Sequence, residues 1–144
     1  MLFGKRKRVV NRILIVEDEP LIAFDNEVML GDMGYEVVAT LDSFEGAIDL
    51  LEREPIDLIL SDYRLSSRRT GLDLARAAKN RGIPIIFSTG HKLPKESMHL
   101  ALGCINKPYN ERTLKLALEA VDKRLSGKKA KPPKGVELFL PGES

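Results

Sequence analysis

Short apolar runs recur along the chain, and each ends abruptly in charged or hydroxyl-bearing residues. The runs ILIV at 13–16, LIL at 58–60 and IPIIF at 83–87 would place apolar side chains on both faces of an extended strand. Strands of that kind are typical of parallel sheets, which are covered by helices on both faces. The pattern therefore favours an α/β fold with a buried parallel sheet.

Helical patterns separate these runs, so strands and helices are expected to alternate five times. The expected strands lie at 12–17, 35–40, 57–62, 83–89 and 104–106. The expected helices begin at Pro20, run over 43–53, 71–79 and 94–102, and end with one capped by Asn110. Because crossovers between parallel strands are right-handed, we expect a doubly wound α/β sheet.

The length of 144 residues suits one domain with a single core. We expect a basic N-terminal arm at 1–11, a folded domain at 12–125 and a Lys/Pro-rich C-terminal tail at 126–144. Five basic and no acidic side chains lie in 1–12, and six basic and no acidic ones in 123–134. Solvated arms are the favoured interpretation of these runs, and contact with nucleic acid or an anionic membrane is the alternative.

Several classes of protein are excluded by composition. One cysteine rules out a disulfide scaffold, and two histidines leave little for a zinc site. No apolar run reaches the ~20 residues that a membrane span needs, and the N-terminus lacks the apolar core of a signal peptide. We therefore expect a soluble, cytoplasmic protein with no membrane span.

Polar side chains with complementary chemistry follow the expected strands. They are Glu17 and Asp18 after the first, Asp62 after the third, Ser88 and Thr89 after the fourth, and Lys107 after the fifth. The carboxyl ends of parallel strands meet at one edge of the sheet, where ligands bind. Converging carboxylates need a cation, and oxygen ligands with retained water suit Mg²⁺. With a lysine and a hydroxyl alongside, these groups could accept a phosphoryl group on a carboxylate.

Four motifs resemble those of the response-regulator receiver domains of bacterial two-component signalling. They are RILIVEDEP, LILSDYRL, PIIFSTG and INKPY, in this order and spacing, and the resemblance covers about residues 10–125. It implies a flavodoxin-like, five-stranded parallel sheet in the order 2-1-3-4-5, with helices on both faces.

The resemblance also implies a role for each site residue. Asp62 would be the phosphoacceptor, Lys107 the partner of the phosphoryl group, and Thr89 the switch hydroxyl. Mg²⁺ would be held by Glu17, Asp18, Asp62 and the backbone carbonyl of Arg64. The Lys107–Pro108 bond would be cis, which only an X-Pro bond adopts cheaply.

The sequence departs from the family pattern at four positions. Glu17 stands where many members have Asp, Ser66 replaces a common proline, and Gly71 lies one residue later than usual. Cys104 replaces the aromatic residue that rotates with the threonine, so a Thr–aromatic switch cannot be carried over. We expect the thiol to be a small core residue, with a redox sensor as the alternative.

One segment resembles a receiver subgroup with the signature P-F-x-F-A-T-G-Y, known from alphaproteobacteria. Its residues Pro84, Phe87, Thr89 and Gly90 match within PIIFSTGH at 84–91. Members of that subgroup are frequently stand-alone, and their partners are histidine kinases of the HWE or HisKA2 type.

The leading hypothesis is a single-domain response regulator, a phosphoacceptor rather than a classical enzyme, because the segment after residue 125 is too short for an output domain. It would act through protein contacts, with a downstream regulator or by self-association, or as a phosphate sink. The alternative is a phosphorylation-independent protein that occupies and inhibits a histidine kinase. A hydrolase of haloacid-dehalogenase type is disfavoured, since EDEP lacks Asp-x-Asp.

The tail contains one short apolar run, Val136 to Leu140. A basic linker precedes this run, and residues 13–122 hold 12 basic against 19 acidic side chains. We expect the run to dock on its own domain or on a neighbouring copy, with a disordered tail as the alternative.

Overall fold

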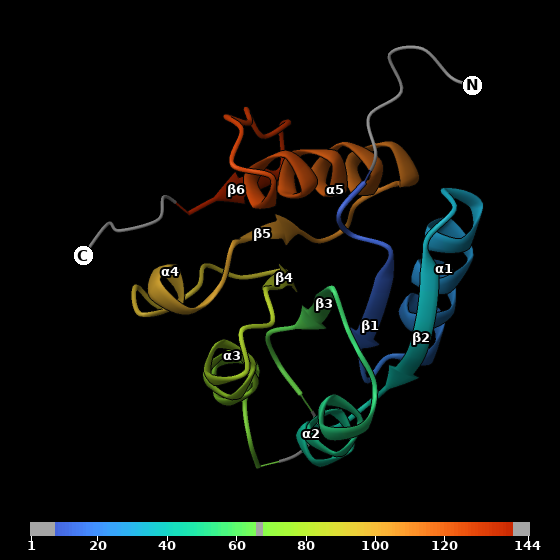
Figure 1. The fold of residues 1–144 in the computed structure, drawn as a ribbon, viewed down its shortest axis with the longest axis vertical. Helices are drawn as coiled ribbons and strands as arrows, with labels where there is room; N and C mark the ends of the chain where they lie inside the picture. Colours follow the sequence, from blue (N-terminus) through green and yellow to red (C-terminus); the bar gives the residue numbers. More distant parts are fainter. Residues whose placement is uncertain (1–7, 66–67, 140–144) are drawn as a thin grey trace.

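The computed structural model describes residues 8–65 and 68–139. Within these residues one six-stranded sheet has the order β2-β1-β3-β4-β5-β6 (Figure 1). The strands are β1 (Arg12–Val16), β2 (Glu36–Leu41), β3 (Leu58–Asp62), β4 (Ile85–Thr89), β5 (Gly103–Asn106) and β6 (Val136–Leu138). The first five pair in parallel, which confirms the α/β fold and the order 2-1-3-4-5 for that part of the sheet.

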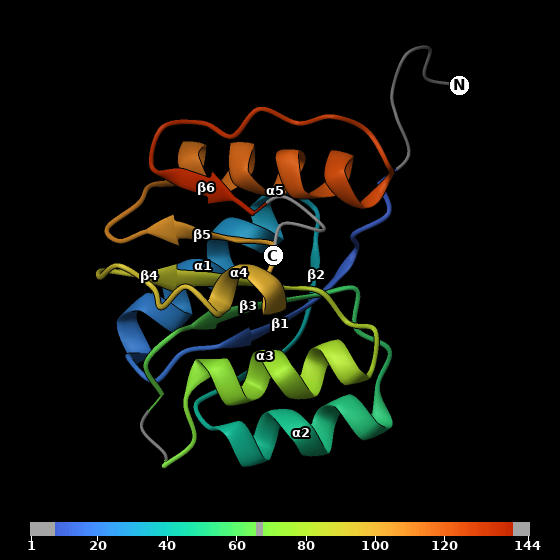
Figure 2. The same cartoon turned by 90° about the vertical axis from the view of Figure 1, so that its left-hand side faces the viewer.

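Helices cover both faces of the sheet. They are α1 (Pro20–Asp32), α2 (Phe44–Arg53), α3 (Gly71–Asn80), α4 (Ser97–Leu100) and α5 (Glu111–Leu125). Figure 2 shows α1 and α5 on one side of the sheet and α2, α3 and α4 on the other. Two apolar cores result, one on each face.

The strands are apolar throughout because both of their faces are buried. In β1, Ile13 and Ile15 pack toward α1 and α5, while Leu14 and Val16 pack toward α2 and α3. All four side chains are fully buried. Each such side chain contributes about 1.5–3 kcal/mol on burial, so these strands fix the sheet.

Local signals in the sequence set the ends of most helices. Pro20 is the first residue of α1, Ser43 Oγ accepts a hydrogen bond from Gly46 N, and Asn110 Oδ1 accepts one from Thr113 N. The helix α4 is shorter than the expected 94–102. Turns that span only three residues, such as Ser97 N to Pro94 O, precede it, and Ala101 is already extended.

The expectation of five strands is corrected by β6. This strand comes from the C-terminal tail and pairs antiparallel with β5, so the sheet is mixed at this edge. The tail therefore docks on its own domain, which is one of the two arrangements expected from the sequence, the other being docking on a neighbouring copy. Burial of Val136 and Phe139 explains the docking. The strand was not predicted because three residues are too few to show an alternating or continuous apolar pattern.

Part of the basic arm also packs on the domain. Arg8 donates hydrogen bonds to the carbonyls of Met33 and Gly34, and its guanidinium lies 4.0 Å from the centre of the Tyr35 ring. The departure at Ser66 lies outside the described residues, as do the ends of the arm and tail. In the part of the chain that the structure describes, no helix is long and apolar enough to cross a membrane.

Candidate phosphoacceptor and metal site

The predicted acidic residues meet at the carboxyl edge of the sheet. Glu17 and Asp18 follow β1, and Asp62 is the last residue of β3, which pairs with β1. One carboxylate oxygen from each of the three lies within 4.8 Å of the other two. The parallel pairing of β1 and β3 thus concentrates three negative charges at one point.

Lys107, just after β5, supplies a positive charge to the same point. Its Nζ lies 3.0 Å from Glu17 Oε1 and 3.3 Å from Asp62 Oδ2. The side chains of Glu17, Asp62 and Lys107 are 1%, 12% and 18% exposed. The cluster is therefore shielded from bulk water, but Asp62 and Lys107 remain reachable.

Burial and charge act in opposite directions on these groups. Burial raises the pKa of Glu17 above its ordinary value of 4.5, although the hydrogen bond from Lys107 opposes the shift. Burial lowers the pKa of Lys107, but the bonds and charges of Glu17 and Asp62 outweigh this and the net direction is upward. Lys107 is therefore held in its ammonium form beside the carboxylates.

Backbone amides orient two of the carboxylates. Glu17 Oε2 accepts a hydrogen bond of 3.2 Å from the amide of Glu19, and Asp62 Oδ1 accepts one of 3.1 Å from the amide of Arg64. These bonds fix the acids in loops that directly follow β1 and β3. Arg64 contacts the site through its backbone amide. The role of its backbone carbonyl as a metal ligand stays a prediction.

Thr89, the last residue of β4, makes its side-chain hydrogen bonds to the loop that follows. Its Oγ1 donates to the carbonyl of His91 and accepts from the amide of the same residue, at 3.0 and 3.1 Å. Its own carbonyl accepts a 2.8 Å bond from the amide of Lys107. Thr89 is thus bonded to the loop after β4, and its role as a switch stays a prediction.

A polar pair that the sequence did not indicate supports the loop after β5. The hydroxyl of Tyr109 donates a 3.0 Å bond to Asn26 Oδ1, and Asn26 is buried within α1. Burial raises the pKa of Tyr109, so the phenol stays protonated. The Lys107–Pro108 bond is cis, as expected. No sequence signal marks Asn26, which stands between Asp25 and Glu27 in a polar stretch of α1.

The donor set fits a hard divalent cation. It consists of carboxylate oxygens, without the sulfur or imidazole that softer metals prefer. Glu17, Asp18 and Asp62 carry three negative charges, and Lys107 can offset only part of them. Mg²⁺ is therefore a chemically suitable partner for this cluster.

Three comparisons with known proteins agree with this geometry. Residues 13–119 match the family described as "Response regulator receiver domain". The transcriptional regulatory protein PdtaR of Mycobacterium tuberculosis is 34% identical over 116 residues, which cover 77% of this chain and 56% of PdtaR.

Solved structures give the same result. The solution structure of SdrG from Sphingomonas melonis has a TM-score of 0.65 and 31% identity, and covers 76% of this chain and 94% of SdrG. The response regulator PhyR from Brucella abortus has a TM-score of 0.61 and 31% identity, and covers 73% of this chain and 44% of PhyR. This chain thus spans about half the length of PdtaR and of PhyR.

The matched segment includes β1 through most of α5, with every residue of the acidic cluster and Lys107. Receiver domains are signalling domains rather than classical enzymes. The chain belongs to the response regulator receiver domain family of two-component systems.

Proposed function

We propose that this chain receives a phosphoryl group from a histidine kinase on Asp62 and transmits the signal through protein contacts or by acting as a phosphate sink. The observation that carries the proposal is the position of Asp62. Its carboxylate lies beside two further carboxylates and 3.3 Å from the ammonium of Lys107, and its side chain is 12% exposed.

The residues of the chain have separable roles in that transfer. A carboxylate oxygen of Asp62 attacks the phosphorus of a phosphohistidine, an O–P bond forms, and the P–N bond breaks. The kinase imidazole leaves and takes up a proton. Lys107 already contacts Asp62 and can turn toward an oxygen of the incoming group, while the amide of Arg64 keeps the carboxylate oriented.

Glu17, Asp18 and Asp62 would hold Mg²⁺, with the backbone carbonyl of Arg64 as a further ligand. When bound, the ion would neutralise negative charge on the carboxylates and the phosphoryl oxygens. Lys107 would meanwhile keep Glu17 in place, because their 3.0 Å bond does not involve Asp62.

An apolar stripe on α1 supports contact with a helical partner near the site. Leu21, Phe24 and Val28 are 81%, 62% and 44% exposed, although their spacing places them along one side of the helix. Large exposed apolar groups at such spacing suit docking against another helix. We propose that a histidine kinase docks here, and the PIIFSTG segment favours a kinase of the HWE or HisKA2 type.

Phosphotransfer from purified, autophosphorylated histidine kinases of the source organism tests the proposal. We expect one kinase to label the chain with an acyl phosphate that hydroxylamine removes, and Asp62→Asn to abolish the label. Asp49→Asn is the matched control, since Asp49 is an exposed carboxylate on α2 that pairs with Arg53, and should be labelled normally. Kinase inhibition that persists in Asp62→Asn without any labelling would instead favour the phosphorylation-independent binding protein.

A further inference from the structure

The tail strand β6 closes the β5 edge through contacts of unusually close fit. A Cβ added to Gly103 would lie 2.0 Å from the carbonyl oxygen of Glu137, so β6 approaches where only glycine leaves room. Phe139 is 6% exposed, its amide donates to Leu102 O at 2.7 Å, and its carbonyl accepts from Arg124 Nη1 at 2.7 Å. The segment 136–139 is thus specifically bound.

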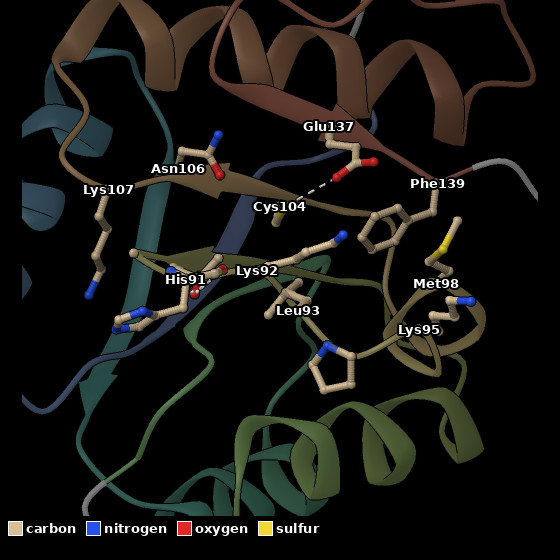
Figure 3. Close-up of a pocket in the computed structure, with 13 residues that line it drawn as sticks. His91, Lys92, Leu93, Lys95, Met98, Cys104, Asn106, Lys107, Glu137 and Phe139 are labelled. Atoms are coloured by element: carbon tan, nitrogen blue, oxygen red, sulfur yellow. Dashed lines mark hydrogen bonds between the residues drawn. The ribbon is translucent and has the colours of Figure 1, made fainter.

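A pocket of about 530 Å³ is lined both by residues of this segment and by Lys107 of the phosphoacceptor site. Lys107 lies at one end of it, and Glu137 and Phe139 lie toward the other (Figure 3). Thr89 also lines the pocket. The loop at 90–95 forms the wall between the two ends. A movement of this loop therefore changes the surroundings of both the site and the tail.

The loop is held in its present position by the hydroxyl of Thr89. That hydroxyl makes both a donated and an accepted bond to the backbone of His91. A phosphoryl group on Asp62 would offer the hydroxyl a charged acceptor, and a charge-assisted bond is stronger than a bond to a carbonyl. The loop would then lose two bonds that shape the wall against which Phe139 lies.

Glu137 is the acidic residue that lines the pocket, and its Oε1 lies 4.0 Å from Cys104 Sγ. The same pocket is lined by Lys92, Lys95 and Lys107. The coupling therefore rests on the bonds of Thr89 to the loop and not on the charge of the phosphoryl group.

We propose that phosphorylation of Asp62 releases segment 136–139 from the β5 edge, so that the tail is a latch closed in the unphosphorylated protein. This inference rests on the proposed function. By linkage, the latch must weaken phosphoryl binding by the same factor by which phosphorylation weakens the latch. Couplings of this kind are typically about 5- to 150-fold.

Cys104 is a built-in reporter of the latch, because it is the one cysteine of the chain. It is 6% exposed, and burial followed by the charge of Glu137 raises the pKa of its thiol to about 11. The docked protein should therefore react slowly with a thiol reagent. Release of the tail would remove Glu137 and admit water, so the thiol would react faster.

The test measures the reaction of Cys104 with Ellman's reagent in the full chain, with and without Mg²⁺ plus beryllofluoride, a phosphoryl mimic. Binding of the mimic is followed separately by ¹⁹F NMR. We expect at least a roughly fivefold faster reaction in the bound state. An unchanged or slower reaction with the mimic bound overturns the latch alone, whereas no binding of the mimic overturns the proposed function and the latch with it.

Two variants separate tail release from a direct effect of loop movement on Cys104. In Phe139→Ala, Cys104 should react fast without the mimic, and the mimic should accelerate the reaction little. This variant should also bind the mimic more tightly than the wild type, by the factor by which the mimic accelerates the reaction of the wild type. Leu125→Ala, an exposed position at the end of α5, is the matched control and should behave as the wild type. An equal acceleration by the mimic in Phe139→Ala and in the wild type would overturn the latch.

Discussion

Replacing Asp18 with Asn should stabilise the metal-free protein. The substitution removes one of three carboxylates whose oxygens lie within 4.8 Å of one another. Lys107 contacts the other two, Glu17 and Asp62, so its charge is already engaged. To a first approximation, Asp18 experiences two repulsions and one attraction, which leaves one net repulsion.

The size of that repulsion follows from the separation. At 4.8 Å, the limit within which these oxygens lie, two unit charges interact by about 3.5 kcal/mol at an effective dielectric constant of 20 and by about 0.9 kcal/mol in water. Asp18 is half-buried, so the gain in the free energy of unfolding should lie between these bounds. For a domain of this size, that corresponds to a rise in Tm of roughly 2–10 °C.

Urea and thermal unfolding in EDTA at low salt measure the effect. Added Mg²⁺ should stabilise the wild type and should stabilise Asp18→Asn much less. Added salt should reduce the difference in stability between Asp18→Asn and the wild type that is measured in EDTA. Asp49→Asn serves as a control, because its exposed carboxylate should change stability by only about 0.5 kcal/mol or less. A less stable Asp18→Asn in EDTA would refute the argument from crowded charge.

Three further predictions follow from named contacts. Burial raises the pKa of Glu17 above 4.5, so on acidification the Mg²⁺ affinity of the wild type should begin to fall at a higher pH than it would with an ordinary glutamate. Glu17→Gln should bind Mg²⁺ more weakly and should lack the part of the pH dependence that comes from protonation of Glu17, as calorimetry across pH would show. Gly71→Ala should lower the free energy of unfolding by about 1–3 kcal/mol, because its Cβ would lie 2.7 Å from a backbone carbonyl oxygen. Gly31→Ala, with open space around it in α1, should raise the free energy of unfolding by up to about 1 kcal/mol, as urea unfolding would measure. Asp122→Ala should lower the free energy of unfolding by about 2–4 kcal/mol and speed amide exchange at Val9 and Val10, just before β1, because a buried carboxylate oxygen of Asp122 accepts the N–H bonds of both. Asp62 should still be phosphorylated, and unchanged exchange would contradict this role of Asp122.

The sheet and the acidic cluster were predictable because their signals are local. A strand buried on both faces is apolar throughout, as in 13–16, and the residue that follows it lies at the edge where neighbouring strands also end. Once the strand order is given, Glu17, Asp62 and Lys107 must converge. The sequence therefore predicted which residues meet, although it did not predict that Lys107 would contact both carboxylates.

Features that depend on distant contacts were not predictable in the same way. The Tyr109–Asn26 bond joins residues 83 positions apart, and neither residue type predicts its partner. The direction of the Thr89 hydroxyl depends on the backbone of His91, two residues later. Such bonds are selected by tertiary geometry, which no periodicity of the sequence encodes.

The tail strand gives a physical reason for two small residues of β5. Gly103 is required because Glu137 lies against it, and Cys104 leaves space where a large side chain would crowd the same segment. The aromatic residue absent at 104 has a counterpart in Phe139, which belongs to the same apolar cluster as Cys104 but comes from the tail. A departure from the family pattern at β5 and an apolar run 32 residues later are therefore two parts of one arrangement, visible only when the strands are paired.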